Sequence, residues 1–262
     1  MKKVGFIGCG NMGGALLRAT AKTGKYEIYA ADFNADKVQT MVNEAGAKAS
    51  DAKQIAGECD FIFIGVKPQM LADCFDKIRD ILSARTDCVL VSMAAGVNIA
   101  KVKSLSGVDR IIRIMPNMPV SVGSGVVLGA GENISDSDKA EFDSIMSCAG
   151  VFDWIDEKFI DAASALSGCG PAFVYMFIEA LADGAVACGL PRDKALLYAA
   201  GTVKGSAQTV LESGKHPGKL KDEVCSPGGT TIMGVKALED GGFRANAMNA
   251  VMEAYKKTKE LG

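Results

Sequence analysis

Three glycines near the start of the chain have the spacing Gly8-x-Gly10-x-x-Gly13. With this spacing the first glycine can make a tight turn after a strand, the second lets the backbone approach a pyrophosphate, and the third lets the next helix pack closely. The N-terminus of that helix offers free N–H groups to phosphate oxygens. The pattern predicts a dinucleotide site, and the residues expected to hold the pyrophosphate are Gly8, Gly10, Asn11, Met12 and Gly13.

The residues around the glycines favour this interpretation over a glycine-rich turn without a ligand. A strand-like run ends at Gly8, and a second one, 27–31, ends beside Asp32, near the interval expected for an acid that binds the adenosine ribose. Asp32 would accept from a ribose hydroxyl and repel a 2′-phosphate, which favours NADH, whereas Asn34 and Lys37 could receive that phosphate. These residues leave the choice between NADPH and NADH open.

Strand-like runs alternate with helical runs from the start of the chain to about residue 155. The strand-like runs are Val4–Gly8, Ile28–Ala31, Phe61–Val66, Cys88–Met93, Ile111–Met115 and Gly125–Leu128. Strands that alternate with helices predict an α/β fold with a parallel, doubly wound sheet of the Rossmann type. Ligands of such sheets bind beyond the carboxyl ends of the strands. The further cofactor-binding residues predicted at these ends are Val66, Lys67, Pro68, Ala95 and Gly96.

The second part of the chain has no strand signal beyond about residue 158. Residues 162–188 are mostly Ala, Gly and large apolar residues, and Pro191 can open a further helix that runs to about Glu212. A helix that is apolar on nearly every side must be buried by something. We therefore expect a dinucleotide-binding domain over 1–157 and a helical dimerisation and substrate-binding domain over 158–262, packed against a second subunit. An ordinary monomeric core is the alternative.

Charge and cysteine usage limit the kinds of partner. The chain has 29 Lys and Arg against 31 Asp and Glu, so we expect a small polar or anionic metabolite rather than nucleic acid or a membrane surface. Eight cysteines without a Cys-x-x-Cys pair, and the single histidine His216, predict no metal site and a reducing compartment. The glycine motif lies where a secretory signal would begin, and the apolar run 172–178 is far shorter than a membrane span, so we expect a cytoplasmic protein.

A second segment, Cys225–Ile232, combines Ser, Pro, two glycines and two threonines. Ser226 followed by Pro227 fits the start of a helix, where proline at the first position loses no hydrogen bond. Free N–H groups and hydroxyls at such a helix start would form a pocket for a carboxylate. The alternative is a simple capped helix after a loop.

Five segments, in this order along the chain, resemble the pyrroline-5-carboxylate reductase family. They are Phe6–Gly13 (FIGCGNMG), Val66–Gln69 (VKPQ), Arg113–Pro119 (RIMPNMP), Ser167–Phe173 (SGCGPAF) and His216–Thr231 (HPGKLKDEVCSPGGTT). They span almost the whole chain, and the last is the most specific mark of the family. Cys169, Phe173 and Met118 stand where many members have Ser, Tyr and Thr.

The resemblance implies that hydride from a reduced nicotinamide, commonly NADPH, reduces the cyclic imine 1-pyrroline-5-carboxylate to L-proline, the last step of proline biosynthesis. It also implies a homodimer, with dimers that often assemble further. Ser226, Gly228, Gly229 and Thr230 would hold the substrate carboxylate. Thr231 would be the catalytic residue and would hydrogen-bond the ring nitrogen.

Imine chemistry agrees with the scarcity of histidine. A protonated imine carbon is already electrophilic, so the protein mainly has to position two rings. Many alcohol-forming dehydrogenases need a histidine or lysine as an acid, whereas His216 lies in a turn-like segment. A β-hydroxyacid dehydrogenase would place its lysine where Val174 stands. Two further alternatives remain. One is a regulatory protein that senses the redox state of the nicotinamide cofactor without catalysing a reaction, and the other is a reductase for a six-membered cyclic imine.

Overall fold

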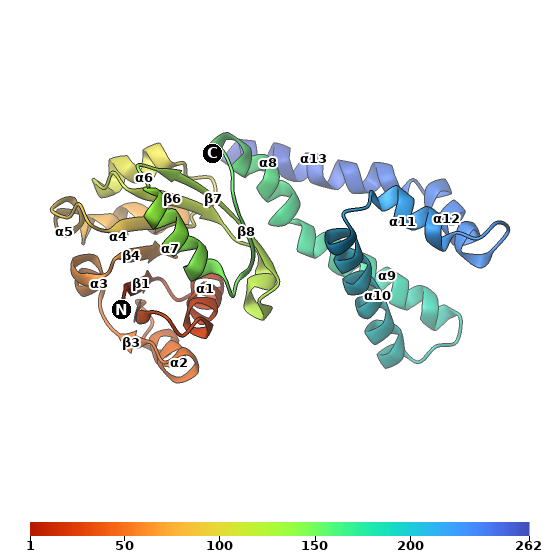
Figure 1. The fold of residues 1–262 in the computed structure, drawn as a ribbon, viewed down its shortest axis with the longest axis horizontal. Helices are drawn as coiled ribbons and strands as arrows, with labels where there is room; N and C mark the ends of the chain where they lie inside the picture. Colours follow the sequence, from red (N-terminus) through yellow and green to blue (C-terminus); the bar gives the residue numbers. More distant parts are fainter. Residues whose placement is uncertain (262) are drawn as a thin grey trace. The chain divides into compact units, whose positions relative to one another are not determined.

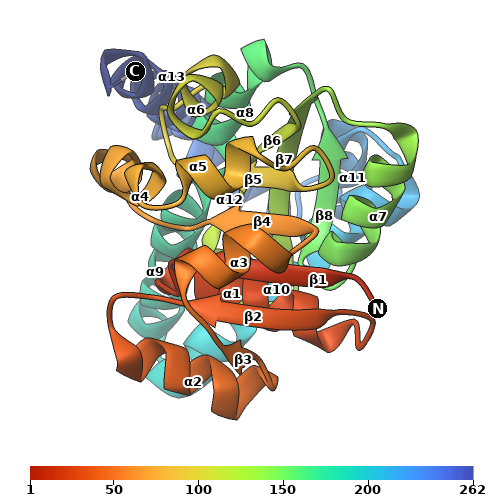
Figure 2. The ribbon, with the colours of Figure 1, turned by 90° about the vertical axis from the view of Figure 1, so that its left-hand side faces the viewer.

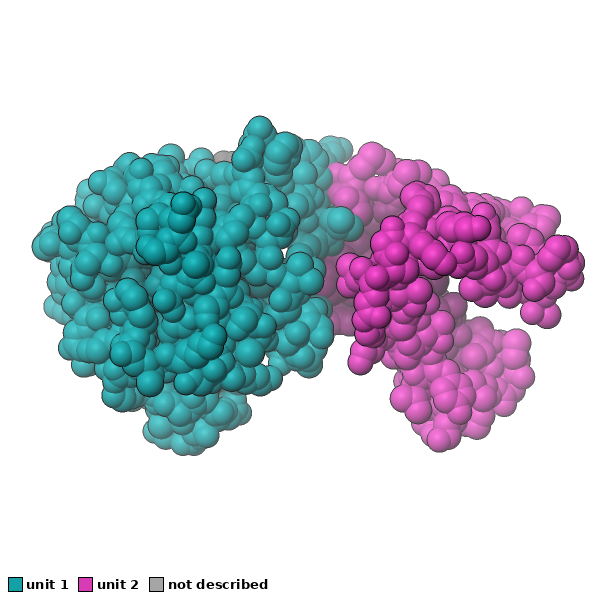
Figure 3. All heavy atoms as spheres, viewed as in Figure 1, with its two compact units in different colours: residues 1–169, 254–262 teal, residues 170–253 magenta. Residues whose placement is uncertain are grey.

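The structure, a computed structural model, describes residues 1–261. The chain forms two compact units: residues 1–169 together with the C-terminal residues from 254 make unit 1, and residues 170–253 make unit 2 (Figure 3). The domain division predicted between residues 157 and 158 stays a prediction.

Unit 1 contains an eight-stranded sheet with the order β3-β2-β1-β4-β5-β6-β7-β8. Figure 2 shows β2, β1, β4 and β5 as successive neighbours. The strands are β1 (Lys3–Ile7), β2 (Glu27–Ala31), β3 (Lys48–Ala49), β4 (Phe61–Ile64), β5 (Val89–Ser92), β6 (Ile111–Met115), β7 (Gly125–Glu132) and β8 (Gly150–Trp154). The predicted Rossmann-type sheet is confirmed, and β3 and β8 are strands that the sequence patterns did not predict.

The sheet is not parallel throughout, which corrects the expectation. β6 and β7 pair antiparallel, while β7 and β8 pair parallel. The connection from β6 to β7, residues 116–124, holds only the short 3₁₀ helix η2 (Met118–Val122). A parallel pair needs a crossover of roughly a dozen residues or more, so this short connection requires an antiparallel neighbour.

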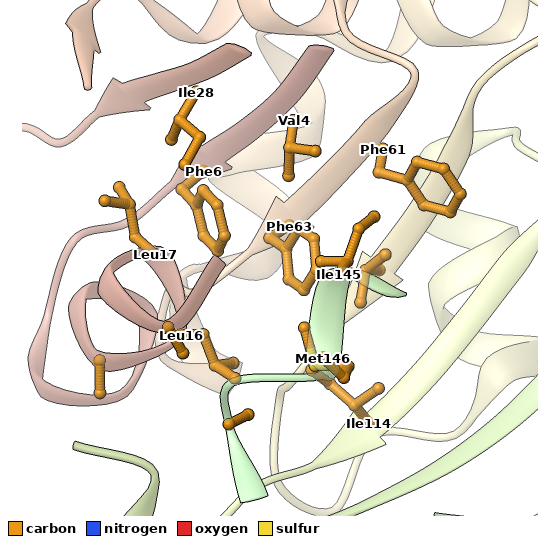
Figure 4. Packing of buried hydrophobic residues seen from close by; sticks show 14 of the residues in the cluster. Val4, Phe6, Leu16, Leu17, Ile28, Phe61, Phe63, Ile114, Ile145 and Met146 are labelled. Carbon is orange, nitrogen blue, oxygen red and sulfur yellow. The ribbon is translucent and has the colours of Figure 1, made fainter. Parts of the chain in front are cut away.

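Helices cover both faces of the sheet (Figure 1). They are α1 (Asn11–Lys22), α2 (Ala35–Ala45), α3 (Ala52–Glu58), η1 (Pro68–Met70), α4 (Leu71–Asp76), α5 (Arg79–Ser83), α6 (Ile99–Ser106), α7 (Asp136–Met146) and α8 (Glu157–Ser167). Alternate strand residues enter different cores because successive side chains of a strand point to opposite faces. Phe6 and Phe63 stack at 4.5 Å between ring centroids in one core (Figure 4). Ile7 and Ile64 belong to the other core.

Unit 2 is entirely helical. Its helices are α9 (Gly170–Ala187), α10 (Arg192–Ser213), α11 (Pro217–Val224), α12 (Thr230–Asp240) and α13 (Phe243–Leu261), the last of which continues into unit 1. Its fully packed core is small and consists of Ala182, Ala195 and Ala199. Large apolar side chains stay exposed on every long helix of this unit, for example Met176, Leu197, Met233 and Met248.

The stretch 157–187 is long and apolar enough, by length and composition alone, to cross a membrane, and only 11% of its apolar window is buried within the chain. The apolar run 172–178 is much shorter than this stretch, because it leaves out the surrounding alanines and glycines, which also contribute to the apolar character. The exposed helices of unit 2 therefore present a surface that a partner must cover.

Candidate functional site

The glycine loop follows β1 and has the geometry that its spacing predicts. Gly8 has a φ of +102°, and a Cβ there would lie 2.7 Å from the carbonyl carbon of Gly65. A Cβ on Gly13 would lie 2.1 Å from the Gly8 carbonyl oxygen. Around Gly10 a Cβ would meet nothing within 4 Å. Gly8 and Gly13 therefore serve packing, whereas Gly10 faces open space.

The N-terminus of α1 has the groups that an anion needs. Its N-cap residue is Gly10, which has no side chain to cap the helix, and its first turn contains no acidic residue. The unsatisfied N–H groups at a helix N-terminus attract phosphate oxygens. Open space at Gly10 beside uncapped N–H groups fits the pyrophosphate of a dinucleotide.

Asp32, the predicted ribose acid, lies beside the glycine loop. One carboxylate oxygen accepts a hydrogen bond from the Cys9 N–H at 2.7 Å, and the other accepts from the Asn34 N–H at 2.9 Å. Asn34 in turn accepts from the Asp36 N–H at 2.9 Å and so caps α2. The carboxylate thus joins the end of β2 to the glycine loop.

A cavity of about 380 Å³ opens beside this loop. It is lined by Cys9, Gly10, Asn11, Arg18, Lys37, Thr40, Met41, Met118 and Ser121. Burial, with a further contribution from the Asp32 carboxylate, raises the pKa of the Cys9 thiol to about 11, so this thiol is neutral near pH 7. A larger hollow of about 570 Å³ is lined by residues such as Lys139 and Trp154 and contains none of the predicted site residues.

The remaining predicted cofactor residues follow the neighbouring strands. Val66, Lys67 and Pro68 come after β4, and Ala95 and Gly96 come after β5. Because β1, β4 and β5 are parallel neighbours, their carboxyl ends lie at the edge of the sheet that carries the glycine loop. The structure therefore brings these two groups of predicted residues to one edge.

Asn117 is a buried residue of this region to which the sequence assigned no role. Its side-chain amide donates to the Ser167 carbonyl at 2.9 Å, and its oxygen accepts from the Val126 N–H at 2.8 Å. It therefore connects the end of β6 to the last residue of α8 and to β7. Its place in the family segment Arg113–Pro119, just after a predicted strand, was the signal in the sequence that pointed to it.

The second candidate segment lies in unit 2 and differs from the expectation. The helix α12 begins at Thr230, not at Ser226 or Pro227, so the predicted helix start is wrong. Gly228 has a φ of +67°, and the Gly229 N–H donates to the Ser226 carbonyl at 3.0 Å, which makes a turn before the helix. The N-cap residue Gly229 provides no side-chain cap.

This correction keeps the features that suggested an anion pocket. The uncapped N–H groups now belong to a helix whose first residues are Thr230 and Thr231, both exposed. An uncapped helix start with two hydroxyls beside it has the chemistry to hold a carboxylate. The preceding turn holds Ser226 and Gly228 next to that helix start.

His216 has a structural position. Its Nδ1 accepts from the Gly218 N–H at 3.1 Å, and the residue is the N-cap of α11. Within residues 1–261 no group of three or more His, Cys, Asp or Glu side chains is arranged to hold a metal ion. The two candidate sites therefore offer backbone N–H groups and hydroxyls as their principal chemistry.

Comparisons with known proteins cover both parts of the chain. The family described as pyrroline-5-carboxylate reductase dimerisation matches residues 157–261, and the family described as NADP oxidoreductase coenzyme F420-dependent matches residues 3–96. The chain is 41% identical to the pyrroline-5-carboxylate reductase of Escherichia coli K12 over 99% of this chain and 98% of that protein.

Two solved structures are similar over nearly their full lengths. The pyrroline-5-carboxylate reductase of Coxiella burnetii has a TM-score of 0.91 at 32% identity and covers 99% of this chain and 98% of its own. The pyrroline carboxylate reductase of Plasmodium falciparum, solved with NADP bound, has a TM-score of 0.87 at 34% identity and covers 100% of this chain and 98% of its own.

The Rossmann-type sheet, the glycine loop and the helical domain define an NAD(P)H-dependent oxidoreductase with its own dimerisation domain. Within that class, the chain belongs to the pyrroline-5-carboxylate reductase family. It is a reductase of proline biosynthesis with an NADP-binding domain, as its motifs predict. The dimerisation domain implies a homodimer, which explains the exposed apolar helices of unit 2.

Proposed function

We propose that this chain transfers hydride from NADPH to the C=N bond of 1-pyrroline-5-carboxylate and so forms L-proline, with the cofactor held by unit 1 and the substrate held by unit 2. The uncapped N-terminus of α1, with open space at Gly10, is the observation that carries the cofactor site. When bound, the reduced nicotinamide supplies the hydride.

The proposed cofactor residues divide by position. The loop residues Gly8, Gly10, Asn11, Met12 and Gly13 hold the pyrophosphate. Asp32 and Asn34 lie at the adenosine end, because they follow β2. The residues after the next two strands, Val66, Lys67, Pro68, Ala95 and Gly96, line the ribose and nicotinamide side. Their support is the parallel pairing of β1 with β2 and β4, and of β4 with β5.

The proposed substrate residues lie at the start of α12. The N–H groups of this helix start, with Ser226, Gly228, Gly229 and Thr230, hold the substrate carboxylate. The Thr231 hydroxyl hydrogen-bonds the ring nitrogen and orients the C=N bond. Because a protonated imine carbon is electrophilic without further activation, orientation is the main contribution of these residues. The helix dipole places partial positive charge at the carboxylate.

The Thr231→Ala variant tests this assignment, with Thr209→Ala in α10 as a matched control because the Thr209 hydroxyl bonds the Gly205 carbonyl within its own helix. We expect Thr231→Ala to lower kcat/KM about 5- to 30-fold, as for the loss of about one to two kcal/mol of hydrogen bonding in the transition state. The NADPH dissociation constant should not change. Undiminished imine turnover in Thr231→Ala would contradict the substrate site.

The domain division, the higher assembly and the location of the protein are part of the same proposal. A dinucleotide-binding domain over 1–157 and a helical domain over 158–262 agree with the start of α8 at Glu157 and with the family match from residue 157. In this proposal the homodimers assemble further. A cytoplasmic location agrees with the eight cysteines, all of which are free thiols in the structure.

A further inference from the structure

Phe33 is the most exposed aromatic residue of unit 1. Its exposed fraction is 84%, whereas Phe6, Phe63 and Phe142 are fully buried. It stands between Asp32 and Asn34, directly after β2 at the proposed adenosine end of the cofactor site. An exposed phenylalanine forgoes the stabilisation that its burial would give, and a ligand that covers the ring would recover it.

The backbone on both sides of Phe33 is held in place. The Asn34 N–H donates to Asp32 at 2.9 Å, and the Asn34 side chain caps α2 by accepting from the Asp36 N–H. The other Asp32 oxygen accepts from the Cys9 N–H in the glycine loop. These bonds fix the backbone that carries the exposed Phe33 and tie it to the glycine loop.

Lys37 approaches the same ring. Its ammonium nitrogen lies 5.5 Å from the Phe33 ring centroid, a cation–π distance, and Lys37 lines the cavity beside Gly10 and Asn11. Among residues 1–261 no carboxylate lies within 4 Å of this ammonium group. Arg18, the other cation of the cavity, is instead paired with Glu44 at 2.6 Å. Of these two cations, Lys37 is the one without an ion pair among the described residues.

We propose that Phe33 and Lys37 select the phosphorylated form of the dinucleotide: the adenine ring stacks on Phe33, and the 2′-phosphate on the adenosine ribose pairs with Lys37. Asp32 acts as a positioning residue, because its carboxylate accepts the Cys9 N–H of the glycine loop and the Asn34 N–H beside Phe33. This inference rests on the proposed cofactor site.

The proposal is tested by calorimetry, which measures the dissociation constants of two probes, adenosine 2′,5′-bisphosphate and adenosine 5′-monophosphate. Neither measurement requires enzyme activity. Lys37→Gln should raise the dissociation constant of the bisphosphate about tenfold and leave that of the monophosphate within about twofold, since only the first carries the 2′-phosphate. Lys53→Gln, at an exposed lysine in α3, is the matched control and should change neither constant.

Variants of Phe33 and Asp32 separate stacking from charge. Phe33→Ala should weaken both probes about tenfold, and Phe33→Trp should restore them, because a stacked base depends on the aromatic face and not on phosphate. Asp32→Asn should weaken both probes together, since it loses a backbone hydrogen bond of the loop.

Three results would overturn the proposal. In the first, the wild type binds both probes, and Lys37→Gln and Phe33→Ala bind them with the same dissociation constants as the wild type. In the second, Asp32→Asn strengthens the bisphosphate alone, which would make Asp32 the selecting residue. In the third, the wild type binds neither probe, in which case the proposed cofactor site fails as well.

Discussion

The three glycines of the loop differ in what surrounds them. Gly13 cannot carry a side chain, because a Cβ would lie 2.1 Å from the Gly8 carbonyl oxygen, whereas Gly10 has free space within 4 Å. The spacing predicted both roles, since each follows from the path of the backbone after a strand. The bonds of Asp32 could not be predicted in the same way, because they depend on how the end of β2 meets the loop.

Alanine at either glycine should weaken cofactor binding, but only alanine at Gly13 should also lower stability. We expect Gly10→Ala to fold with wild-type thermal stability and to bind NADPH at least tenfold more weakly, because its methyl group enters the space proposed for the pyrophosphate. Gly13→Ala should lose both stability and binding, since the loop must shift. Thermal unfolding and NADPH titration measure the two effects. If Gly10→Ala binds NADPH with wild-type affinity, the proposed position of the pyrophosphate beside Gly10 is wrong.

Two buried thiols predict how stability depends on pH. Burial raises the pKa of Cys59 to about 12, and burial together with Asp32 raises that of Cys9 to about 11, from an ordinary value of 9.0. The folded state therefore favours the neutral thiols. Their contribution to the free energy of unfolding is complete below pH 9 and is lost as the pH rises toward 11 and 12.

Urea unfolding at pH 8 and pH 11 checks this prediction. The wild type should lose more stability between these two values than the double variant Cys9→Ala/Cys59→Ala, whose absolute stability is lower but which lacks the two titrations. An equal loss in both proteins would show that the thiols do not couple folding to pH.

At the scale of elements, the sequence predicted the six strands that carry strong apolar runs and missed two others. β3 has only two residues, and β8 alternates exposed and half-buried residues, so neither has the continuous apolar run of a buried strand. The antiparallel direction of β7 was also missed, because apolar content does not encode strand direction. The start of α12 was placed too early because Ser-Pro imitates a helix start, whereas the left-handed Gly228 delays it.

The link between β6 and α8 depends on one buried arginine. Arg113 donates to Glu157 at 3.2 Å and to Asp161 at 3.0 Å, and its Nε is buried without a hydrogen-bond partner. Glu157 also accepts from the Ile99 N–H at 2.7 Å, at the start of α6. The arginine thus joins the sheet to the first helix of the matched dimerisation region.

We expect Arg113→Met to lower the free energy of unfolding by roughly 3 kcal/mol, because it removes the guanidinium that neutralises two partly buried carboxylates, Glu157 and Asp161. Lys259→Gln is the control, since Lys259 is exposed and lies 3.8 Å from Asp161, and its effect should stay within about 0.5 kcal/mol. Chemical denaturation compares the two variants. An effect of Arg113→Met as small as that of the control would contradict a structural role for this network.

At the scale of the whole molecule, unit 2 cannot bury its own apolar residues. Met176 in α9 is 69% exposed and Leu197 in α10 is 63% exposed, although these two helices pack against each other. The sequence already predicted a partner from the apolar content of residues 162–188. It could not show which side chains remain outside the chain's own core, because that depends on how α9 and α10 pack.

Charges on these helices should disrupt the homodimer. We expect the double variant Met176→Glu/Leu197→Glu to sediment as a monomer or to dimerise with a dissociation constant at least 100-fold higher than that of the wild type. The reason is that dimerisation would bury the introduced carboxylates. Val122→Glu, at a similarly exposed apolar residue of η2, should leave the dimer intact. Analytical ultracentrifugation distinguishes the two. A dimer of unchanged affinity in the double variant would exclude this face from the interface.

The reaction itself tests the proposed function. Purified protein is mixed with 1-pyrroline-5-carboxylate and NADPH, or separately NADH, while absorbance at the nicotinamide band and the formation of proline are followed together. We expect one L-proline to form for each NADPH oxidised, at a higher rate than with NADH. If the protein binds NADPH but oxidises neither cofactor in the presence of this imine, it does not catalyse the proposed reaction.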